Sequence, residues 1–304
     1  MTDDTILNRY ADELTSVKYI TNPAIARDKE IKELILVLLT PEKSAILVGK
    51  PGIGKTAIVE GLAYLIQQKQ VPNALLGYRI FRVNTTALIG NDNKGENRVL
   101  KLVEELKTQD KVILFIDEIH TLIGNGTFDL ANMFKEGLSR GTIKMIGATT
   151  TYEYEKFILR DKAFNRRFDK VEVSEPTEDM CVQILLQTLP KIEYQTRVRM
   201  PYVPYVKEQI MRFVVNMTSE YKRVSELGSR YPDIALVLVR QMFSNAVYNN
   251  RKYVAFKDIY DAIRFTKVVY PDVIKKELVV FKETFKEELK YENIKVDPEN
   301  YLNN

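Results

Sequence analysis

Residues 44–68 have the sequence SAILVGKPGIGKTAIVEGLAYLIQQ, and this stretch decides the fold. Its centre, Gly49–Thr56, fits the pattern G-x-x-x-x-G-K-[S/T]. A strand-forming apolar run precedes the pattern, and apolar residues at three- and four-residue intervals follow it, as in an amphipathic helix. A strand, a glycine-rich loop and a helix in this order predict a phosphate-binding loop, because backbone N–H groups there point at the anion.

Each part of this loop has an expected task. Its three glycines allow the backbone to turn tightly. Lys55 is expected to reach the β and γ phosphates of ATP, and Thr56 to ligate Mg²⁺. A glycine-rich turn that only joins a strand to a helix is the alternative, but eight matched positions between the right flanks favour nucleotide binding. The expected ATP-binding residues of the loop are Gly49, Lys50, Pro51, Gly52, Ile53, Gly54, Lys55, Thr56 and Ala57.

Short β-branched runs alternate with segments of helical period from residue 40 to about residue 175. This alternation predicts an α/β fold in which a parallel sheet is covered by helices. Residues 56–68 and 96–109 have the apolar spacing of two such covering helices. The five expected strands are residues 44–48, 78–84, 112–118, 143–148 and 170–175.

Strand signals almost vanish after residue 175, where amphipathic helical patterns take over. The sequence therefore predicts a large nucleotide-binding α/β domain over 1–175 and a small helical lid domain over 176–267. Residues 268–304 are expected to form a separate extension, with one charged helix and a polar tail. The lid helices are expected at residues 177–189, 206–221, 233–249 and 256–267, and the charged helix at 275–290.

Two adjacent carboxylates, Asp117 and Glu118, end the expected strand VILFIDE. Ligand sites of such sheets lie at the carboxyl ends of the strands. We expect Asp117 to hold Mg²⁺ through water, and Glu118 to orient and deprotonate the water that attacks ATP. An accidental acidic strand end is the alternative. His120, the only histidine, is interpreted as a packing or hydrogen-bonding residue, since no nucleophile motif lies near it.

The composition of the 304 residues excludes several classes of protein. One cysteine, Cys181, and one histidine give neither a disulfide framework nor a Cys/His metal cluster. No apolar run is long enough to cross a membrane, and the N-terminus lacks the pattern of a signal peptide, so we expect a cytoplasmic protein. The net charge of +4 is spread along the chain and neither requires nor excludes nucleic acid.

Six stretches together resemble the first AAA+ ATPase module of the Clp and ClpB-like protein-unfolding chaperones. They cover residues 20–175 almost without a gap, and RYPDIALVLV at 230–239 resembles a turn in the helical lid of that family. The six stretches are NPAIARDKEI, LVGKPGIGKTAIVEGLA, VPNALLGYRIFRVNTTALIG, VILFIDEIHTLIG, MIGATTTYEY and DKAFNRRFDKVEVSEPT.

The resemblance implies roles for residues outside the phosphate loop. Ile25 would lie against the adenine, and Pro232 and Asp233 of the lid would pack against the adenosine. Thr149 would be the sensor that contacts the γ phosphate through the attacking water. The implied activity is hydrolysis of ATP to ADP and phosphate, with ATP and Mg²⁺ as cofactors.

The family's adjacent arginines fall on Arg166 and Arg167. The resemblance implies that they project into the nucleotide site of the neighbouring subunit, where such an arginine stabilises charge on the transferred phosphoryl group. A solvated basic pair on a helix is the alternative. An arginine supplied by a neighbour completes the site only in a ring, so we expect a homo-oligomer, most often a hexamer in this family.

The parts that define the substrate depart from the family pattern. Asn93 stands where a pore loop of the family has an aromatic residue, in the stretch 90–99. The second pore segment, 124–133, is short compared with the family, and its Phe128 is interpreted either as a substitute apolar contact or as a buried packing residue. By its length, the chain is also expected to lack the family's N-terminal substrate-binding domain, coiled-coil insertion and second ATPase module.

Three functions remain open at this point. The favoured one is a Clp-like motor that remodels or disassembles a protein complex with the energy of ATP. The second is an AAA+ protein that acts on DNA or a replication complex, which the slight basicity permits but no recognition motif supports. The third is an assembly factor that oligomerises with ATP and hydrolyses it slowly, against which the intact Glu118 and the arginine pair argue.

Overall fold

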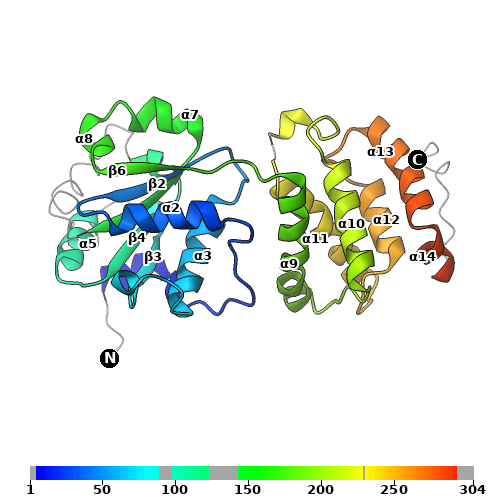
Figure 1. Cartoon of the computed structure of the whole chain (residues 1–304), viewed down its shortest axis with the longest axis horizontal. Helices are drawn as coiled ribbons and strands as arrows, with labels where there is room; N and C mark the ends of the chain where they lie inside the picture. Colours follow the sequence, from blue (N-terminus) through cyan, green and yellow to red (C-terminus); the bar gives the residue numbers. More distant parts are fainter. Residues whose placement is uncertain (1–4, 89–97, 123–142, 229, 293–304) are drawn as a thin grey trace. The chain divides into compact units, whose positions relative to one another are not determined.

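The computed structural model describes residues 5–88, 98–122, 143–228 and 230–292. The chain divides into two compact units (Figure 1). One comprises residues 1–50 and 54–174, and the other comprises residues 175–304 with the three residues 51–53 of the glycine-rich loop. The first unit contains the sheet, and the second consists of helices.

The first unit is built on a six-stranded sheet with the order β1-β3-β4-β5-β2-β6. The pairs β3–β4, β4–β5, β5–β2 and β2–β6 are parallel, and β1 pairs antiparallel with β3 at one edge. The predicted α/β fold is confirmed, but the sheet has one strand more than expected among the described residues. The strands are β1 (Ala11–Glu13), β2 (Ser44–Val48), β3 (Arg79–Val83), β4 (Val112–Ile116), β5 (Lys144–Thr149) and β6 (Phe168–Glu172).

Strand β1 escaped the sequence analysis because its three residues, Ala-Asp-Glu, have neither β-branching nor alternation. It becomes a strand because β3 offers its free edge, with Ala11 opposite Val83 and Glu13 opposite Phe81. Strands β2 and β4, by contrast, are buried at every residue. Burial on both faces explains why their sequences are continuous apolar runs.

Helices flank the sheet in the first unit (Figure 1). The two expected covering helices are present as α3 (Lys55–Gln67) and α5 (Arg98–Lys107), and α2 (Asp28–Leu39) packs on β2 and β6. The shorter helices and helical turns of this unit are α1 (Ile6–Tyr10), η1 (Leu14–Ser16), η2 (Asn73–Leu75), α4 (Thr85–Leu88), η3 (Ile119–Leu122), α7 (Thr151–Glu153), η4 (Tyr154–Ile158) and α8 (Lys162–Asn165).

The second unit has its own core, which six helices form among the described residues. Helix α9 continues past Pro190, where the sequence pattern indicated an end near residue 189, because Ile192 in its last turns is buried in this core. No helix among the described residues, including the 19-residue α9, is long and apolar enough to cross a membrane. The elements are α9 (Glu178–Thr196), α10 (Pro204–Met217), η5 (Ser225–Leu227), α11 (Asp233–Tyr248), α12 (Phe256–Arg264), α13 (Pro271–Thr284) and α14 (Lys286–Tyr291).

The expected C-terminal extension shares the core of the helical unit. The stretch predicted as one charged helix forms α13 and α14, separated at Phe285. Phe285 is 2% exposed, and its ring lies 5.4 Å from that of Phe256 and 4.9 Å from that of Phe281, measured between centroids. The break in the helix turns Phe285 and then Leu289 into the same apolar cluster.

Candidate nucleotide site

The glycine-rich loop connects the end of β2 to the start of α3, as the sequence pattern predicts. Gly52 has φ 74° and Gly54 has φ 98°, backbone conformations that favour glycine. Gly54 is the last residue before α3, so its left-handed turn aims the first N–H groups of the helix toward the loop. Gly49, the third glycine of the expected turn, does not have a positive φ.

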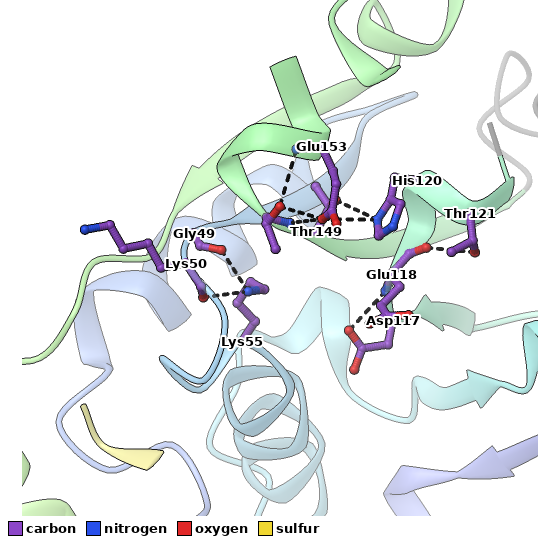
Figure 2. Close-up of polar contacts among 10 residues, drawn as sticks. Gly49, Lys50, Lys55, Asp117, Glu118, His120, Thr121, Thr149 and Glu153 are labelled. Carbon is purple, nitrogen blue, oxygen red and sulfur yellow. Dashed lines mark hydrogen bonds and ion pairs between the residues drawn. The ribbon is translucent and has the colours of Figure 1, made fainter. Parts of the chain in front are cut away.

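Lys55 lies over this loop (Figure 2). Its ammonium donates hydrogen bonds to the carbonyl oxygens of Gly49, at 2.8 Å, and Lys50, at 2.9 Å. Burial lowers the pKa of Lys55 below its ordinary value, while the carboxylates of Asp117, Glu153 and Glu118 act in the opposite direction. The lysine is therefore held at the loop by backbone carbonyls and by the charge of three nearby acids.

The two adjacent carboxylates lie where β4 has already ended, at Ile116. Thr56 Oγ1 donates a hydrogen bond to Asp117 Oδ2 at 2.9 Å and so connects the loop helix to this strand. Glu118 has φ 51°, a left-handed conformation that is costly for a residue with a side chain. This turn explains how neighbouring residues, which point to opposite faces within a strand, both come to the same edge of the sheet (Figure 2).

Thr149, the expected sensor, is the last residue of β5, which lies between β4 and β2 in the sheet. Its carbonyl oxygen accepts a hydrogen bond from the N–H of Gly49 at 3.3 Å, and its side chain is buried. Its hydroxyl lies 3.0 Å from His120 Nδ1. His120, interpreted from the sequence as a packing or hydrogen-bonding residue, makes both kinds of contact, since its ring also stacks on Phe157.

Glu153 belongs to the same group of residues, and the sequence analysis did not find it. Its Oε2 accepts a hydrogen bond from the Thr150 N–H at 3.1 Å, and the Glu153 N–H donates to Thr150 Oγ1 at 3.3 Å. These reciprocal bonds form a capping box at the start of α7. The spacing of a threonine and a glutamate three residues later is the signal that predicts such a pair.

Ile25, expected against the adenine, is buried in the segment that precedes α2. This segment packs directly on α3, because a Cβ at Gly61 would come within 2.2 Å of the Ala24 Cβ. Gly61 was also missed by the sequence analysis. A glycine inside an otherwise regular helical pattern is the signal for such a close approach.

The arginine pair lies at the other end of the sheet. The Arg167 carbonyl oxygen accepts a hydrogen bond from the N–H of Ser44, the first residue of β2, at 2.9 Å. The carbonyl oxygen of Arg166 accepts one from Lys43 Nζ at 3.2 Å. The glycine-rich loop follows the last residue of β2, about 17 Å further along at the usual strand rise. The structure therefore does not bring the arginines to the loop of their own chain.

The remaining predicted residues belong to the helical unit or lie outside the described residues. Pro232 and Asp233 belong to the helical unit, where Asp233 is the first residue of α11. Their role at the adenosine stays a prediction. Asn93 and Phe128, with the two segments that resemble pore loops, lie outside the described residues.

A bound Mg²⁺ would need oxygen ligands at the phosphate site. No group of three or more His, Cys, Asp or Glu arranged to hold a metal ion occurs in the described part of the chain. Magnesium in phosphoryl-transfer sites, however, is usually held by one or two protein oxygens together with phosphates and water. Thr56 Oγ1 and Asp117 Oδ2, 2.9 Å apart, are oxygen ligands of this kind, so the residues present fit the ion.

This arrangement of strand, loop and carboxylates is that of a P-loop nucleotide-binding domain, and the comparison with known families agrees. Residues 45–175 match the ATPase family associated with various cellular activities (AAA). The chain therefore contains a nucleotide-binding ATPase domain of the AAA family, and its predicted resemblance to Clp-type chaperones is confirmed by its relatives.

Similar proteins include the chaperone protein ClpB of Aquifex aeolicus, which is 40% identical over 220 residues, covering 70% of this chain and 21% of ClpB. A homologue of the Clp protease ATP-binding subunit ClpA in Trieres chinensis is 42% identical over 197 residues, covering 62% of this chain and 22% of the homologue. Among solved structures, a complex of S. cerevisiae Hsp104 with casein matches with a TM-score of 0.73 and 38% identity, covering 86% of this chain and 45% of Hsp104. The chain thus spans about a fifth of these curated relatives and under half of that Hsp104 chain.

Proposed function

We propose that the chain is a motor subunit that hydrolyses ATP between the subunits of a ring and uses the energy to remodel or disassemble a protein complex. The observation that supports this proposal is that the expected catalytic residues lie at two opposite edges of one sheet. The phosphate loop, Asp117, Glu118 and Thr149 share the carboxyl edge of the strands, and the arginine pair lies at the amino edge.

The residues at the carboxyl edge supply most of a hydrolytic site. The N–H groups of the loop and of the first turn of α3 would bind the phosphates, and Lys55 would neutralise their charge. Thr56 and Asp117 would hold Mg²⁺, which supplies charge neutralisation at the phosphates. Glu118 would accept the proton of the attacking water, and the Thr149 hydroxyl would fix the position of that water or of the γ phosphate.

The missing element is a cation that stabilises charge on the transferred phosphoryl group. Arg166 and Arg167 have the right chemistry, but their backbone is tied to the start of β2. An arginine at that position serves the nucleotide of another copy far more readily than its own. A closed ring in which each subunit donates to the next follows from such a head-to-tail contact, and a hexamer is the proposed number.

The proposed substrate is a protein. S. cerevisiae Hsp104, a structural relative of this chain, has been solved in complex with casein. The segments that would contact a substrate in the pore lie outside the described residues, so this part of the proposal depends on the relatives alone.

The decisive experiment compares wild type with Glu118→Gln in the presence of ATP, recording particle mass and phosphate release together. Glu118→Gln should keep the ring and lower turnover at least about a hundredfold, because the general base is lost while binding groups remain. Glu155→Gln, which changes an exposed carboxylate two residues after Glu153, is the matched control and should behave as wild type. A monomer without turnover in both wild type and control contradicts the proposal.

The substrate is tested in the same assay. Casein should stimulate phosphate release by wild type. If DNA stimulates phosphate release instead, and binds in a salt-sensitive way, the chain acts on nucleic acid and not on a protein substrate. Assembly with negligible turnover under every condition would indicate an ATP-gated assembly factor.

A further inference from the structure

Three side chains from different parts of the first unit meet at the hydroxyl of Thr149 (Figure 2). His120 comes from η3, directly after the carboxylate pair, and its Nδ1 lies 3.0 Å from Thr149 Oγ1. Glu153 comes from α7, and its Oε2 lies 3.4 Å both from Thr149 Oγ1 and from His120 Nδ1. Thr149 is 2% exposed, so these neighbours replace water around its hydroxyl.

The charge of Glu153 determines which way the hydrogen bonds run. An ionised carboxylate only accepts hydrogen bonds, so an unprotonated Nδ1 beside it would place two lone pairs against each other. This repulsion favours the tautomer of His120 with its hydrogen on Nδ1, from which the ring would donate to Thr149 Oγ1. A threonine hydroxyl has a single hydrogen, which is now directed away from His120. That hydrogen is left for Glu153, for a phosphate oxygen or for a water molecule.

Glu153 is well suited to stay ionised and fixed. Burial alone raises the pKa of its carboxyl, but hydrogen bonds from the hydroxyl and N–H of Thr150, with the nearby His120, outweigh burial and hold the pKa below its usual value. The Thr150 hydroxyl donates to Glu153 Oε2 at 2.5 Å, far closer than Thr149 does. The Glu153 carboxylate can thus lose its long hydrogen bond from the Thr149 hydroxyl and still accept hydrogen bonds from Thr150.

We propose that His120 and Glu153 are positioning residues for ATP hydrolysis, which orient the single hydrogen of the Thr149 hydroxyl so that it can pass from Glu153 to the γ phosphate or the attacking water. This inference rests on the proposed ATPase function and on Thr149 as its sensor. His120 sets the direction of the hydroxyl by donating to it. Glu153 sets the tautomer of His120 and anchors the backbone that follows Thr149.

The placement of these residues couples the sensor to the rest of the site. His120 is separated from Glu118 by one residue, so the histidine directly follows the turn that carries the proposed general base. The carboxylate of Glu153 also acts on the pKa of Lys55, which places its charge within electrostatic reach of the phosphate loop. A purely structural role would need the ring of His120 against Phe157, but not its Nδ1 hydrogen.

The test separates these two roles by a pair of substitutions at His120. His120→Phe keeps an aromatic ring to stack on Phe157 and removes the donor. His120→Asn loses the ring but restores an N–H donor close to the position of Nδ1. We expect kcat of His120→Phe to fall roughly three- to tenfold, as for the loss of one hydrogen bond, with His120→Asn closer to wild type. A fluorescent ADP analogue should bind all three proteins equally, since ADP has no γ phosphate.

Glu153→Gln provides an independent variant if a His120 variant fails to fold. It should lower kcat by a similar factor and, combined with His120→Phe, should lower it no further, because both act through one hydroxyl. The proposal is overturned if His120→Phe is as active as wild type or more active than His120→Asn, or if the two losses multiply. If wild type shows no turnover, the proposed function itself is overturned. If wild type hydrolyses ATP, Glu118→Gln does not, and the His120 and Glu153 variants are as active as wild type, only this inference is overturned.

Discussion

Thr56 Oγ1 donates a hydrogen bond to Asp117 Oδ2 across 61 residues of sequence, and this bond joins the two halves of the proposed Mg²⁺ site. Thr56→Val should therefore weaken the dependence of ATP affinity on Mg²⁺, since it keeps the shape but removes one of the two protein oxygens. Thr56→Ser, which restores a hydroxyl, is the control and should retain the dependence. Binding of a fluorescent ATP analogue with Mg²⁺ and with EDTA measures both. A valine variant that responds to Mg²⁺ as strongly as wild type would show that Thr56 is not a ligand.

The arginine pair offers a test of catalysis between subunits. Arg166→Ala should lower turnover by roughly 10³-fold or more, as for other arginines supplied in trans, without changing nucleotide binding by the single chain. Arg160→Ala, an exposed arginine of the same stretch, is the matched control. Mixing Arg166→Ala with Glu118→Gln chains should recover part of the turnover, because some interfaces then pair an intact arginine with an intact carboxylate. No recovery in assembled mixed rings would contradict a site shared between neighbours.

The close contact of Gly61 with Ala24 predicts a tight steric limit beside Ile25. Gly61→Ala adds a methyl group 2.2 Å from the Ala24 Cβ, so the segment that carries Ile25 must move away from α3. We expect a loss of about 1–3 kcal/mol in the free energy of unfolding, typical of overpacking, and weaker binding of ADP. The double variant Gly61→Ala/Ala24→Gly should recover part of both. Denaturant unfolding and ADP titration check this, and an unchanged stability of Gly61→Ala would argue against the contact.

The hydrogen bonds of the Glu175 carboxylate predict how the stability of the helical unit depends on pH. Its Oε1 accepts hydrogen bonds from Arg223 at 2.8 Å and from the Tyr231 N–H at 2.9 Å. Burial raises the pKa of this carboxyl, but these bonds outweigh burial and lower it below the ordinary value of 4.5. The folded-state pKa thus lies below the unfolded one, so the stabilisation is present above the unfolded value and is lost as pH falls through the folded value.

Melting of wild type and Glu175→Gln between pH ~7 and ~3.5 measures this contribution. Wild type should be the more stable at neutral pH, and the difference should shrink on the acid side, because glutamine does not titrate. Glu220→Gln, at a more exposed partner of Arg223, should show a smaller change. Wild-type and Glu175→Gln curves that run parallel over the whole range would contradict the assignment.

Local patterns predicted most of what determines this fold. The stretch 44–68 contains a strand, its loop and a helix in one continuous signal, and the structure has them within one residue of the expected bounds. The last strand starts two residues earlier than expected, at Phe168. What the sequence analysis missed depends on partners distant in the chain. Strand β1 exists only because β3 has a free edge, and the separation of α13 from α14 follows from the burial of Phe285.

The candidate site shows the same division. Lys55, Thr56, Asp117 and Glu118 were found because each belongs to a short motif with its own chemistry. Glu153 was not found, although the local spacing of Thr150 and Glu153 indicates a capping pair. Gly61 was not found because its importance lies in a contact with Ala24, which only the folded chain brings near it. The roles of Ile25, Pro232 and the arginine pair follow from family resemblance and stay predictions.

Strand β2 has the phosphate loop at one end, and at the other its first residue donates a hydrogen bond to the Arg167 carbonyl oxygen. All five of its residues are buried, and it is paired on both sides, with β5 and β6, so its backbone is held by hydrogen bonds along its length. In the proposed ring, β2 would therefore connect each nucleotide site to the arginines that serve the neighbouring one. Neighbouring nucleotide sites around such a ring would then be coupled through this strand. The order in which the sites hydrolyse ATP would depend on how β2 transmits movement from one site to the next.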